Sequence, residues 1–98
     1  MKYNITIILS AQNDLRTIHE YLADFGEDSQ KKFRASFDKF IEHISSMPYM
    51  FKEYAKKPKY RMAALAYGYI AFYKINKSKR SILIYRVLNS KQNIIDLL

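Results

Sequence analysis

The sequence predicts an α+β fold in which a strand and a helical hairpin precede a three-stranded antiparallel meander, so that two helices cover one face of a four-stranded sheet. Three observations predict this fold. A short alternating apolar run comes first, two apolar stripes of helical period follow, and three runs rich in β-forming residues come last. A chain of 98 residues encloses one hydrophobic core, so residues 1–98 are expected to form one domain.

The first half of the sequence is expected to form one strand and two helices. Residues 3–9 (YNITIIL) alternate in polarity and are rich in β-branched side chains, which predicts a strand. Ser10 is a candidate N-cap for a helix that ends at Gly26, and a second helix begins at the acidic residue Glu27. Apolar residues lie on one face of each helix: Ala11, Leu15, Ile18, Leu22 and Phe25 in the first, and Phe33, Phe37, Phe40, Ile41 and Ile44 in the second. The short turn between the helices predicts an antiparallel hairpin.

The second half is expected to complete the sheet. Pro48 stops the second helix and begins a connector, residues 48–58, which is rich in aromatic residues and lysine. Strands are predicted at residues 59–65, 69–75 and 81–88, and their short connections favour an antiparallel meander. The C-terminal segment 94–98, which is apolar except for Asp96, is expected either to fold back on the sheet or to contact a partner.

Composition and charge narrow the classes of function. The chain has no cysteine, which excludes disulfides and thiolate chemistry, and no apolar run approaches the ~20 residues that span a bilayer. No signal peptide is recognisable, so a cytoplasmic protein without membrane contact is expected. Residues 1–49 hold six basic and seven acidic residues, whereas residues 50–98 hold eleven basic and two acidic residues. The resulting net charge of +9 in the second half predicts an anionic partner, either nucleic acid or an acidic protein.

Two arginines within the predicted strands are the most unusual polar residues. Arg61 and Arg86 lie among apolar and aromatic neighbours, where a cation is costly unless it reaches solvent or an anion. Each arginine could meet an external anion, or it could form an ion pair with a helix carboxylate such as Asp14 or Glu20. The even-numbered residues of the last strand, Arg86 among them, are expected to share one side of the sheet.

Conventional catalytic sites are missing from the sequence pattern. His19 and His43 are far apart and adjoin the apolar stripes, and no cluster of His or acidic residues has metal-ligand spacing, so no metal or other cofactor is expected. Any catalysis would use lysine, arginine and tyrosine, which can stabilise charge and move a proton at a phosphodiester. Several tyrosines alternate with basic residues and could stack on nucleic-acid bases or pack within the sheet: Tyr60, Tyr67, Tyr69, Tyr73 and Tyr85.

Four segments carry a resemblance to a known family: YNITIILSAQNDLRTIHEYL, MPYMFKEY, YRMAALAYGYIAFYKI and IYRVLNSKQNIIDLL. In their order and spacing they resemble the RelE/ParE family of toxins from type II toxin-antitoxin systems, over almost the whole chain. The resemblance implies a basic cytoplasmic toxin that is associated with growth inhibition and plasmid stabilisation. It also implies a cognate antitoxin, which is expected to be acidic and to neutralise the toxin.

The family combines two activities. RelE-like members cleave mRNA on the ribosome without a conventional acid/base pair, whereas ParE-like members inhibit DNA gyrase by protein contact. In RelE-like toxins an arginine commonly follows the tyrosine that begins the third strand, but here Tyr69 is followed by Ile70, and Asn89 stands where histidine is usual. The resemblance therefore favours a ParE-like gyrase inhibitor that is not an enzyme. The alternatives are a RelE-like, metal-independent endoribonuclease that acts with the ribosome on mRNA, and a non-toxic interaction module.

The resemblance also implies site residues. The residues expected to contact the target are Lys59, Arg61, Tyr73, Arg86, Asn89 and Lys91. In the RelE-like alternative, Arg61, Arg86 and Lys91 would surround the scissile phosphate and act as catalytic residues. The residues expected to contact the antitoxin are apolar: Leu15, Ile18, Leu22, Phe33, Phe37, Ile94 and Leu97.

Overall fold

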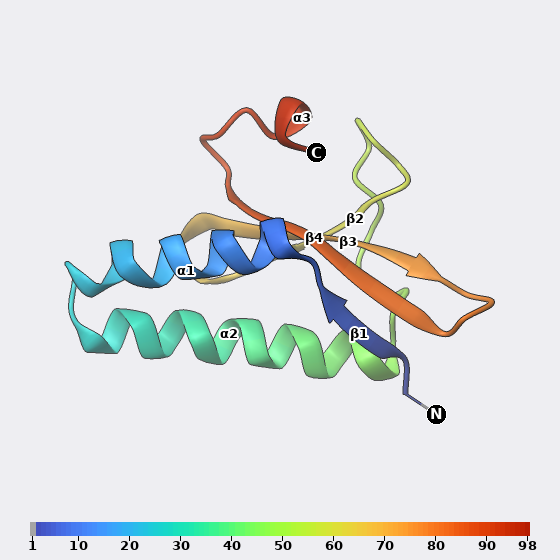
Figure 1. Cartoon of the computed structure of the whole chain (residues 1–98), viewed down its shortest axis with the longest axis horizontal. Coiled ribbons are helices and arrows are strands. Elements are labelled where there is room, and N and C mark those ends of the chain that lie inside the picture. Colours follow the sequence, from blue (N-terminus) through green and yellow to red (C-terminus); the bar gives the residue numbers. More distant parts are fainter. Residues whose placement is uncertain (1) are drawn as a thin grey trace.

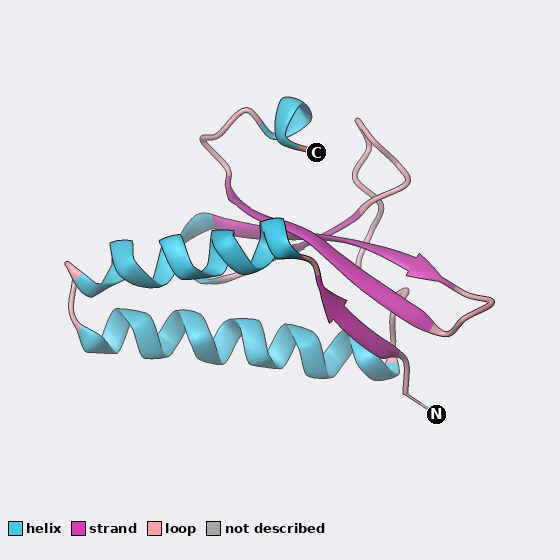
Figure 2. Ribbon diagram, in the orientation of Figure 1, coloured by secondary structure: helices cyan, strands magenta, loops and turns pink. Residues whose placement is uncertain are grey.

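The computed structural model describes residues 2–98 and has the predicted α+β architecture (Figures 1 and 2). Its elements are, in order, β1 (Asn4–Ile7), α1 (Leu9–Ala23), α2 (Glu27–Ser46), β2 (Arg61–Ala64), the 3-10 turn η1 (Ala66–Gly68), β3 (Tyr69–Asn76), β4 (Ser81–Asn89) and α3 (Ile94–Leu97). The helical hairpin α1–α2 lies on one side of the sheet, and the short helix α3 lies on the other (Figure 1). No helix within residues 2–98 is long and apolar enough to cross a membrane.

The sheet is mixed, with the strand order β1-β4-β3-β2. The last three strands form the predicted antiparallel meander, whereas β1 pairs in parallel with β4, with Ile5 opposite Ile82. The chain reaches this parallel position because the hairpin α1–α2 carries it back across the sheet. As a result the start of α1 lies beside the middle of β4, where the amide of Ile8 donates to the carbonyl of Ile84 at 3.1 Å.

The helix ends differ in detail from the predicted ones. α1 begins at Leu9 with Ile8 as its N-cap, and Ser10 lies inside the first turn, so the prediction of a Ser10 cap is wrong. The side-chain amide of Gln12 instead donates to the carbonyl of Ile7 at 2.7 Å. Gly26 links the two helices with φ +106° and ψ 161°, a conformation that residues with a Cβ essentially do not adopt.

The main core lies between the helical hairpin and the sheet. The predicted helical stripes are confirmed for most positions, and the buried helical residues are Ala11, Ile18, Leu22, Phe33, Phe37, Phe40 and Ile44. Phe25 is an exception, because α1 already ends at Ala23, and its side chain is 63 % exposed. Ring contacts join the layers: Phe33 packs edge-on against Tyr69, and Phe40 against Tyr73.

A bulge in β4 changes which of its residues face the helices. Phe72 lies opposite Arg86 but the next residue of β3, Tyr73, lies opposite Ile84, which leaves Tyr85 without a cross-strand partner. The prediction that even-numbered residues of β4 share one side is therefore wrong. Ile84 packs in the main core, whereas Leu88 packs on the opposite face of the sheet.

The opposite face, which we call the far face, carries a smaller core. Its buried residues are Tyr60, Phe72 and Leu88. The residues around them come from the connector, the sheet and the C-terminal segment: Tyr54, Met62, Ile70, Tyr85, Ile94 and Leu98. The C-terminal segment therefore folds back on the sheet as α3, and the hydroxyl of Tyr60 donates to the main-chain oxygen of Leu98 at 3.2 Å.

Candidate functional site

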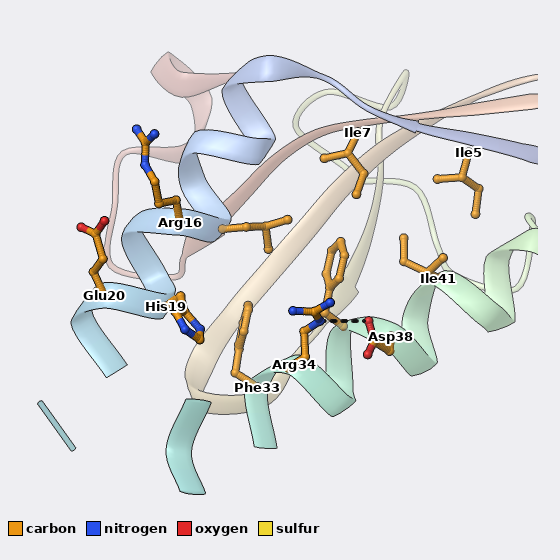
Figure 3. Close-up of a pocket in the computed structure, with 11 residues that line it drawn as sticks. Ile5, Ile7, Arg16, His19, Glu20, Phe33, Arg34, Asp38 and Ile41 are labelled. Carbon is orange, nitrogen blue, oxygen red and sulfur yellow. Dashed lines mark ion pairs between the residues drawn. The ribbon is translucent and has the colours of Figure 1, made fainter. Parts of the chain in front are cut away.

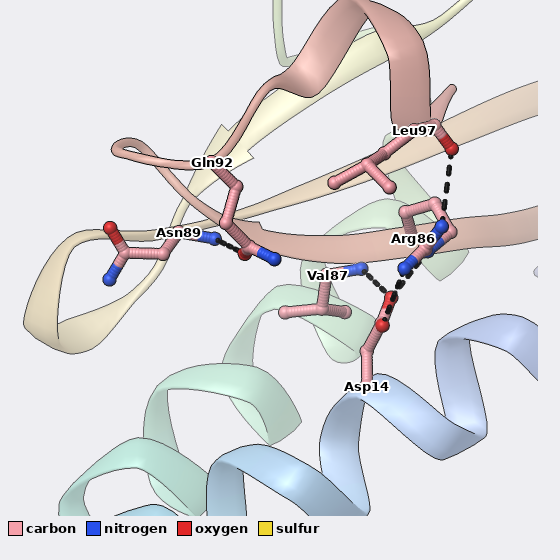
Figure 4. A network of polar contacts seen from close by, with 6 residues as sticks. All are labelled: Asp14, Arg86, Val87, Asn89, Gln92 and Leu97. Carbon is pink, nitrogen blue, oxygen red and sulfur yellow. Dashed lines mark hydrogen bonds and ion pairs between the residues drawn. The ribbon is translucent and has the colours of Figure 1, made fainter.

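Arg86 is held by a network of hydrogen bonds that joins three elements (Figure 4). Its Nε donates to Asp14 Oδ2 at 2.7 Å and its Nη2 to Asp14 Oδ1 at 2.9 Å, which makes a bidentate ion pair between β4 and α1. The Nη1 atom donates to the carbonyl of Leu97 in α3 at 3.2 Å. The backbone amide of Val87 donates to the same Oδ2 at 2.9 Å, so the Asp14 carboxylate accepts three bonds.

The sequence left two partners open for Arg86, an external anion and a helix carboxylate, and this network shows the second. The ion pair with a helix carboxylate is present, and the hydrogen bond to Asp14 is the main reason why the pKa of Arg86 is raised above its ordinary value. Only 23 % of the Arg86 side chain and 14 % of the Asp14 side chain are exposed. The guanidinium is therefore neutralised and fixed within the fold.

Arg61 is held by different partners. Its Nη1 donates to the carbonyl of Phe51 at 2.7 Å, its Nη2 lies 3.9 Å from Glu53 Oε2, and its guanidinium lies 5.0 Å from the ring centre of Tyr49. All three partners belong to the connector, so Arg61 attaches the connector to the sheet edge. Within residues 2–98, Arg61 and Arg86 share no partner, because the partners of Arg61 lie in the connector and those of Arg86 are Asp14 and Leu97.

Tyr73, another predicted target contact, lies in the main core. Its side chain is 0 % exposed, and its hydroxyl donates to the carbonyl of Pro48 at 2.8 Å. Burial raises its pKa to about 12, although the nearby Arg61 cation acts in the opposite direction. Tyr73 is thus a neutral donor that anchors the start of the connector, and it presents no surface to a partner.

Asn89 is the last residue of β4, and Lys91 lies in the turn that follows. The amide of Asn89 donates to Gln92 Oε1 at 2.7 Å, and the amide of Lys91 donates to Asn89 Oδ1 at 2.9 Å. The Asn89 side chain therefore shapes the turn, as asparagine often does. Lys91 is exposed and, like exposed Lys59, keeps its ammonium group at the surface.

A group of lysine and tyrosine residues lies on the far face, and one of its members, Lys74, was not singled out from the sequence. Lys74 on β3 places its ammonium 5.1 Å from the ring centre of Tyr85 and 5.8 Å from that of Tyr60. The ammonium of Lys59 lies 5.4 Å from the same Tyr60 ring, and the two tyrosine rings meet edge-on at 5.3 Å. We call these four residues the lysine–tyrosine cluster. The alternation of tyrosine and basic residues in the sequence indicated such contacts, but it did not predict which of these residues would lie together.

A groove of about 660 Å³ opens between β1, α1 and α2 (Figure 3). Its walls are apolar and are formed by Ile5, Ile7, Leu15, Phe33, Phe37 and Ile41. Polar side chains from both helices surround it: Arg16, His19, Glu20, Arg34 and Asp38. Arg34 and Asp38 pair with each other across one helical turn at 3.5 Å.

The residues predicted to contact an antitoxin do not form one surface. Leu15, Phe33 and Phe37 line the groove, although both phenylalanines are almost fully buried. Ile18 and Leu22 lie in the main core, where they attach α1 to the sheet and present little surface to a partner. The two from the C-terminal segment lie on α3, away from the groove, and are Ile94 and Leu97.

Three solved structures of other proteins share this fold. A double mutant of Escherichia coli toxin RelE in the free state superposes with a TM-score of 0.72 and 15% identity, covering 98% of this chain and 92% of that one. The chromosomal ParDE system of P. aeruginosa gives a TM-score of 0.71 and 15% identity, over 90% of this chain and 96% of that one. The RelBE2 toxin-antitoxin complex of Mycobacterium tuberculosis gives a TM-score of 0.60 and 20% identity, over 91% of this chain and 99% of that one.

These identities are low, so the three structures establish a likeness of fold. No curated protein sequence matches the chain. A family model does match, and it describes the ParE toxin of the type II toxin-antitoxin system parDE. The match covers residues 6–94, which include the main core, the bulged strand and the turn after it. On the strength of this nearly complete match, the chain belongs to the ParE family of type II toxin-antitoxin toxins.

Proposed function

We propose that this toxin arrests growth by contacting DNA gyrase and not by cleaving RNA. The observation that carries the proposal is the bidentate pairing of Arg86 with Asp14. A cation that stabilises charge on a phosphate during cleavage has to be available to that phosphate. Arg86 already has its charge satisfied by an internal carboxylate, and Arg61 is bonded to the connector. Contact with a target protein makes no such demand on either arginine.

A supercoiling assay with purified gyrase and relaxed plasmid tests this proposal. The purified toxin is expected to inhibit supercoiling at the concentrations that stop growth, while transcripts in arrested cells stay intact. The control is the same toxin preparation mixed beforehand with its antitoxin, which should restore supercoiling. Cleavage of mRNA at ribosomal A sites, with gyrase unaffected, would instead establish the RelE-like alternative and overturn the proposal.

We further propose that a cognate antitoxin neutralises the toxin by laying an amphipathic segment in the groove between β1, α1 and α2. Two of the similar structures are described as toxin-antitoxin systems or complexes, which supports an antitoxin as the occupant. The groove has apolar walls and a rim that carries Arg16 and Arg34 together with Glu20 and Asp38. Such a lining suits a helix that has one apolar face and charged flanks.

Leu15→Asp tests the groove because it places a charge on one wall. This variant is expected to remain toxic but to escape neutralisation when the antitoxin is co-expressed. The matched control is Asn13→Asp, which makes the same change in charge at an exposed position of α1 outside the groove. Retained toxicity shows that each variant folds. Equal neutralisation of both variants would exclude the groove as the antitoxin site.

A further inference from the structure

The positive charge of this protein is concentrated in the half of the chain that builds the meander and the connector. Residues 50–98 hold eleven basic and two acidic residues. Both acidic residues have internal partners, because Glu53 lies 3.9 Å from Arg61 and Asp96 accepts a bond from Asn93 Nδ2 at 2.7 Å. The helical hairpin, by contrast, has nearly balanced charges and internal i, i+4 pairs. Charge is therefore segregated between the two layers.

The lysine–tyrosine cluster is the organised part of this basic layer. Lys59 and Lys74 approach the same Tyr60 ring, at 5.4 Å and 5.8 Å, and Lys74 also approaches Tyr85 at 5.1 Å. Within residues 2–98, neither lysine takes part in an ion pair. The rings orient the ammonium groups without neutralising them, because a cation–π contact leaves the full charge in place. Two ammonium groups without an acidic partner attract anions to this surface.

Further lysines extend the cluster in two directions. Lys56 and Lys57 precede Lys59 in the connector, and Lys77 and Lys79 lie in the turn of the β3–β4 hairpin, which projects beyond the body of the fold (Figure 1). Apart from Lys57, these lysines are exposed. Positive charge thus runs along the connector and out along the hairpin, which suits an extended polyanion better than a single small anion.

The tyrosine rings indicate which part of a nucleic acid this surface would meet. Tyr60 is 4 % exposed, and its hydroxyl is bonded to Leu98, so its face is not available for a base. Tyr85 is half-buried, with one lysine and the edge of Tyr60 against it. Base stacking needs open aromatic faces, whereas lysine ammonium groups bind backbone phosphates as point charges. The cluster is therefore suited to binding backbone phosphates and not to stacking on bases.

We propose that the lysine–tyrosine cluster and its flanking lysines bind the phosphate backbone of double-stranded DNA without regard to sequence. This inference rests on the proposed function, since gyrase works on duplex DNA. It extends that function by adding DNA to the surfaces that the toxin contacts. The toxin would contact gyrase together with the DNA that the enzyme holds.

Fluorescence anisotropy with a labelled duplex of about 20 base pairs tests the inference at salt concentrations between about 50 and 200 mM. Wild-type toxin is expected to bind with a steep salt dependence. Lys59→Gln/Lys74→Gln is expected to lower the affinity about tenfold or more and to reduce the slope of log K against log salt by about two. The conservative variant Lys59→Arg/Lys74→Arg is expected to keep both the affinity and the slope. It also shows whether the site tolerates substitution.

The matched control is Lys32→Gln/Lys39→Gln, which removes the same charge from exposed positions of α2. It is expected to bind like the wild type. Equal losses in the two Gln variants would mean that net charge alone drives binding, and they would overturn the proposal. Stronger binding to a single-stranded RNA of equal length than to the duplex would also overturn it.

The supercoiling assay separates this inference from the proposed function. If gyrase is inhibited equally by wild type and by Lys59→Gln/Lys74→Gln, the gyrase proposal stands and a role for DNA contact falls. If the cluster variant loses duplex binding specifically while wild-type toxin leaves gyrase untouched, the DNA surface stands and the gyrase proposal falls.

Discussion

Asp14 and Arg86 are 72 residues apart in the sequence, and they meet through two hydrogen bonds of 2.7 and 2.9 Å. The pair joins the first helix to the last strand next to the bulge, which leaves the neighbouring Tyr85 without a cross-strand partner. The amide of Val87 donates to the same carboxylate, and the carbonyl of Leu97 accepts a hydrogen bond from the same guanidinium. One ion pair therefore connects the helical layer, the sheet and the C-terminal segment.

Removing this carboxylate is expected to destabilise the fold substantially. Asp14→Ala leaves the guanidinium of Arg86 and the amide of Val87 without their acceptor in a mostly buried position, so the free energy of unfolding should fall by about 2–4 kcal/mol. Urea denaturation measures the change. The control is Lys31→Ala, which breaks an exposed pair with Glu27 and should cost about 0.5 kcal/mol or less. A cost for Asp14→Ala that is no larger than the control would contradict the structural role of the pair.

Gly26 provides a test of the turn between the helices. A Cβ placed there would meet nothing within 4 Å, so any cost of Gly26→Ala comes from its backbone conformation at φ +106°. We expect a loss of about 1–3 kcal/mol in the free energy of unfolding. Gly68→Ala is the comparison, because Gly68 also has open space but a φ of +77°, and its cost should be smaller, about 1 kcal/mol. Thermal or urea denaturation of both variants checks the order, and a reversed order would refute the argument.

The periodic parts of this fold could be predicted from the sequence, whereas the non-periodic ones could not. Helical stripes such as the one containing Phe33 and Phe37 follow from spacing alone, and the meander follows from runs of β-forming residues with short turns. The bulge at Tyr85 depends on how two strands align, and strict alternation does not reveal such a shift. The parallel partner of β1 likewise depends on the path of the whole chain.

The same distinction holds for the candidate site. The sequence indicated that Arg86 needed an anion, and it offered Asp14 as one possibility, because a cation in a strand has few alternatives. It did not indicate the partners of Arg61 and Tyr73, because both bind carbonyls of the irregular connector. A hydrogen bond to a backbone carbonyl in a loop does not depend on the side chain of the accepting residue, so the sequence carries no pattern that predicts it. For that reason two of the predicted target contacts prove to be anchors of the connector.

Tyr73 predicts a specific change in stability at alkaline pH. Burial places its pKa at about 12, above the 10.0 of an ordinary tyrosine, so the unfolded chain loses this proton first as the pH rises. The contribution of Tyr73 to the free energy of unfolding is complete below about pH 10 and is lost as the pH rises through about 12.

Tyr73→Phe isolates that contribution. At neutral pH the variant should lose about 1 kcal/mol, because it lacks the hydrogen bond to Pro48. Between about pH 10 and 12 the difference should shrink and then favour the variant, over a total change of about 3 kcal/mol. Urea denaturation at a series of pH values measures both curves. Parallel curves across this range would show that Tyr73 is not protected from ionisation by the fold.

Arg86→Lys separates a structural role of Arg86 from a catalytic one. Lysine keeps the positive charge but cannot make the bidentate contact with Asp14, so the free energy of unfolding should fall by about 1–2 kcal/mol. If Arg86 only holds the fold together, growth arrest should persist at low temperature, where the variant is still folded, and should fade as it melts. A variant with wild-type melting behaviour and no toxicity would mean that the guanidinium acts directly on the target. Circular dichroism melting curves and growth curves of induced cultures, recorded at the same temperatures, distinguish these outcomes.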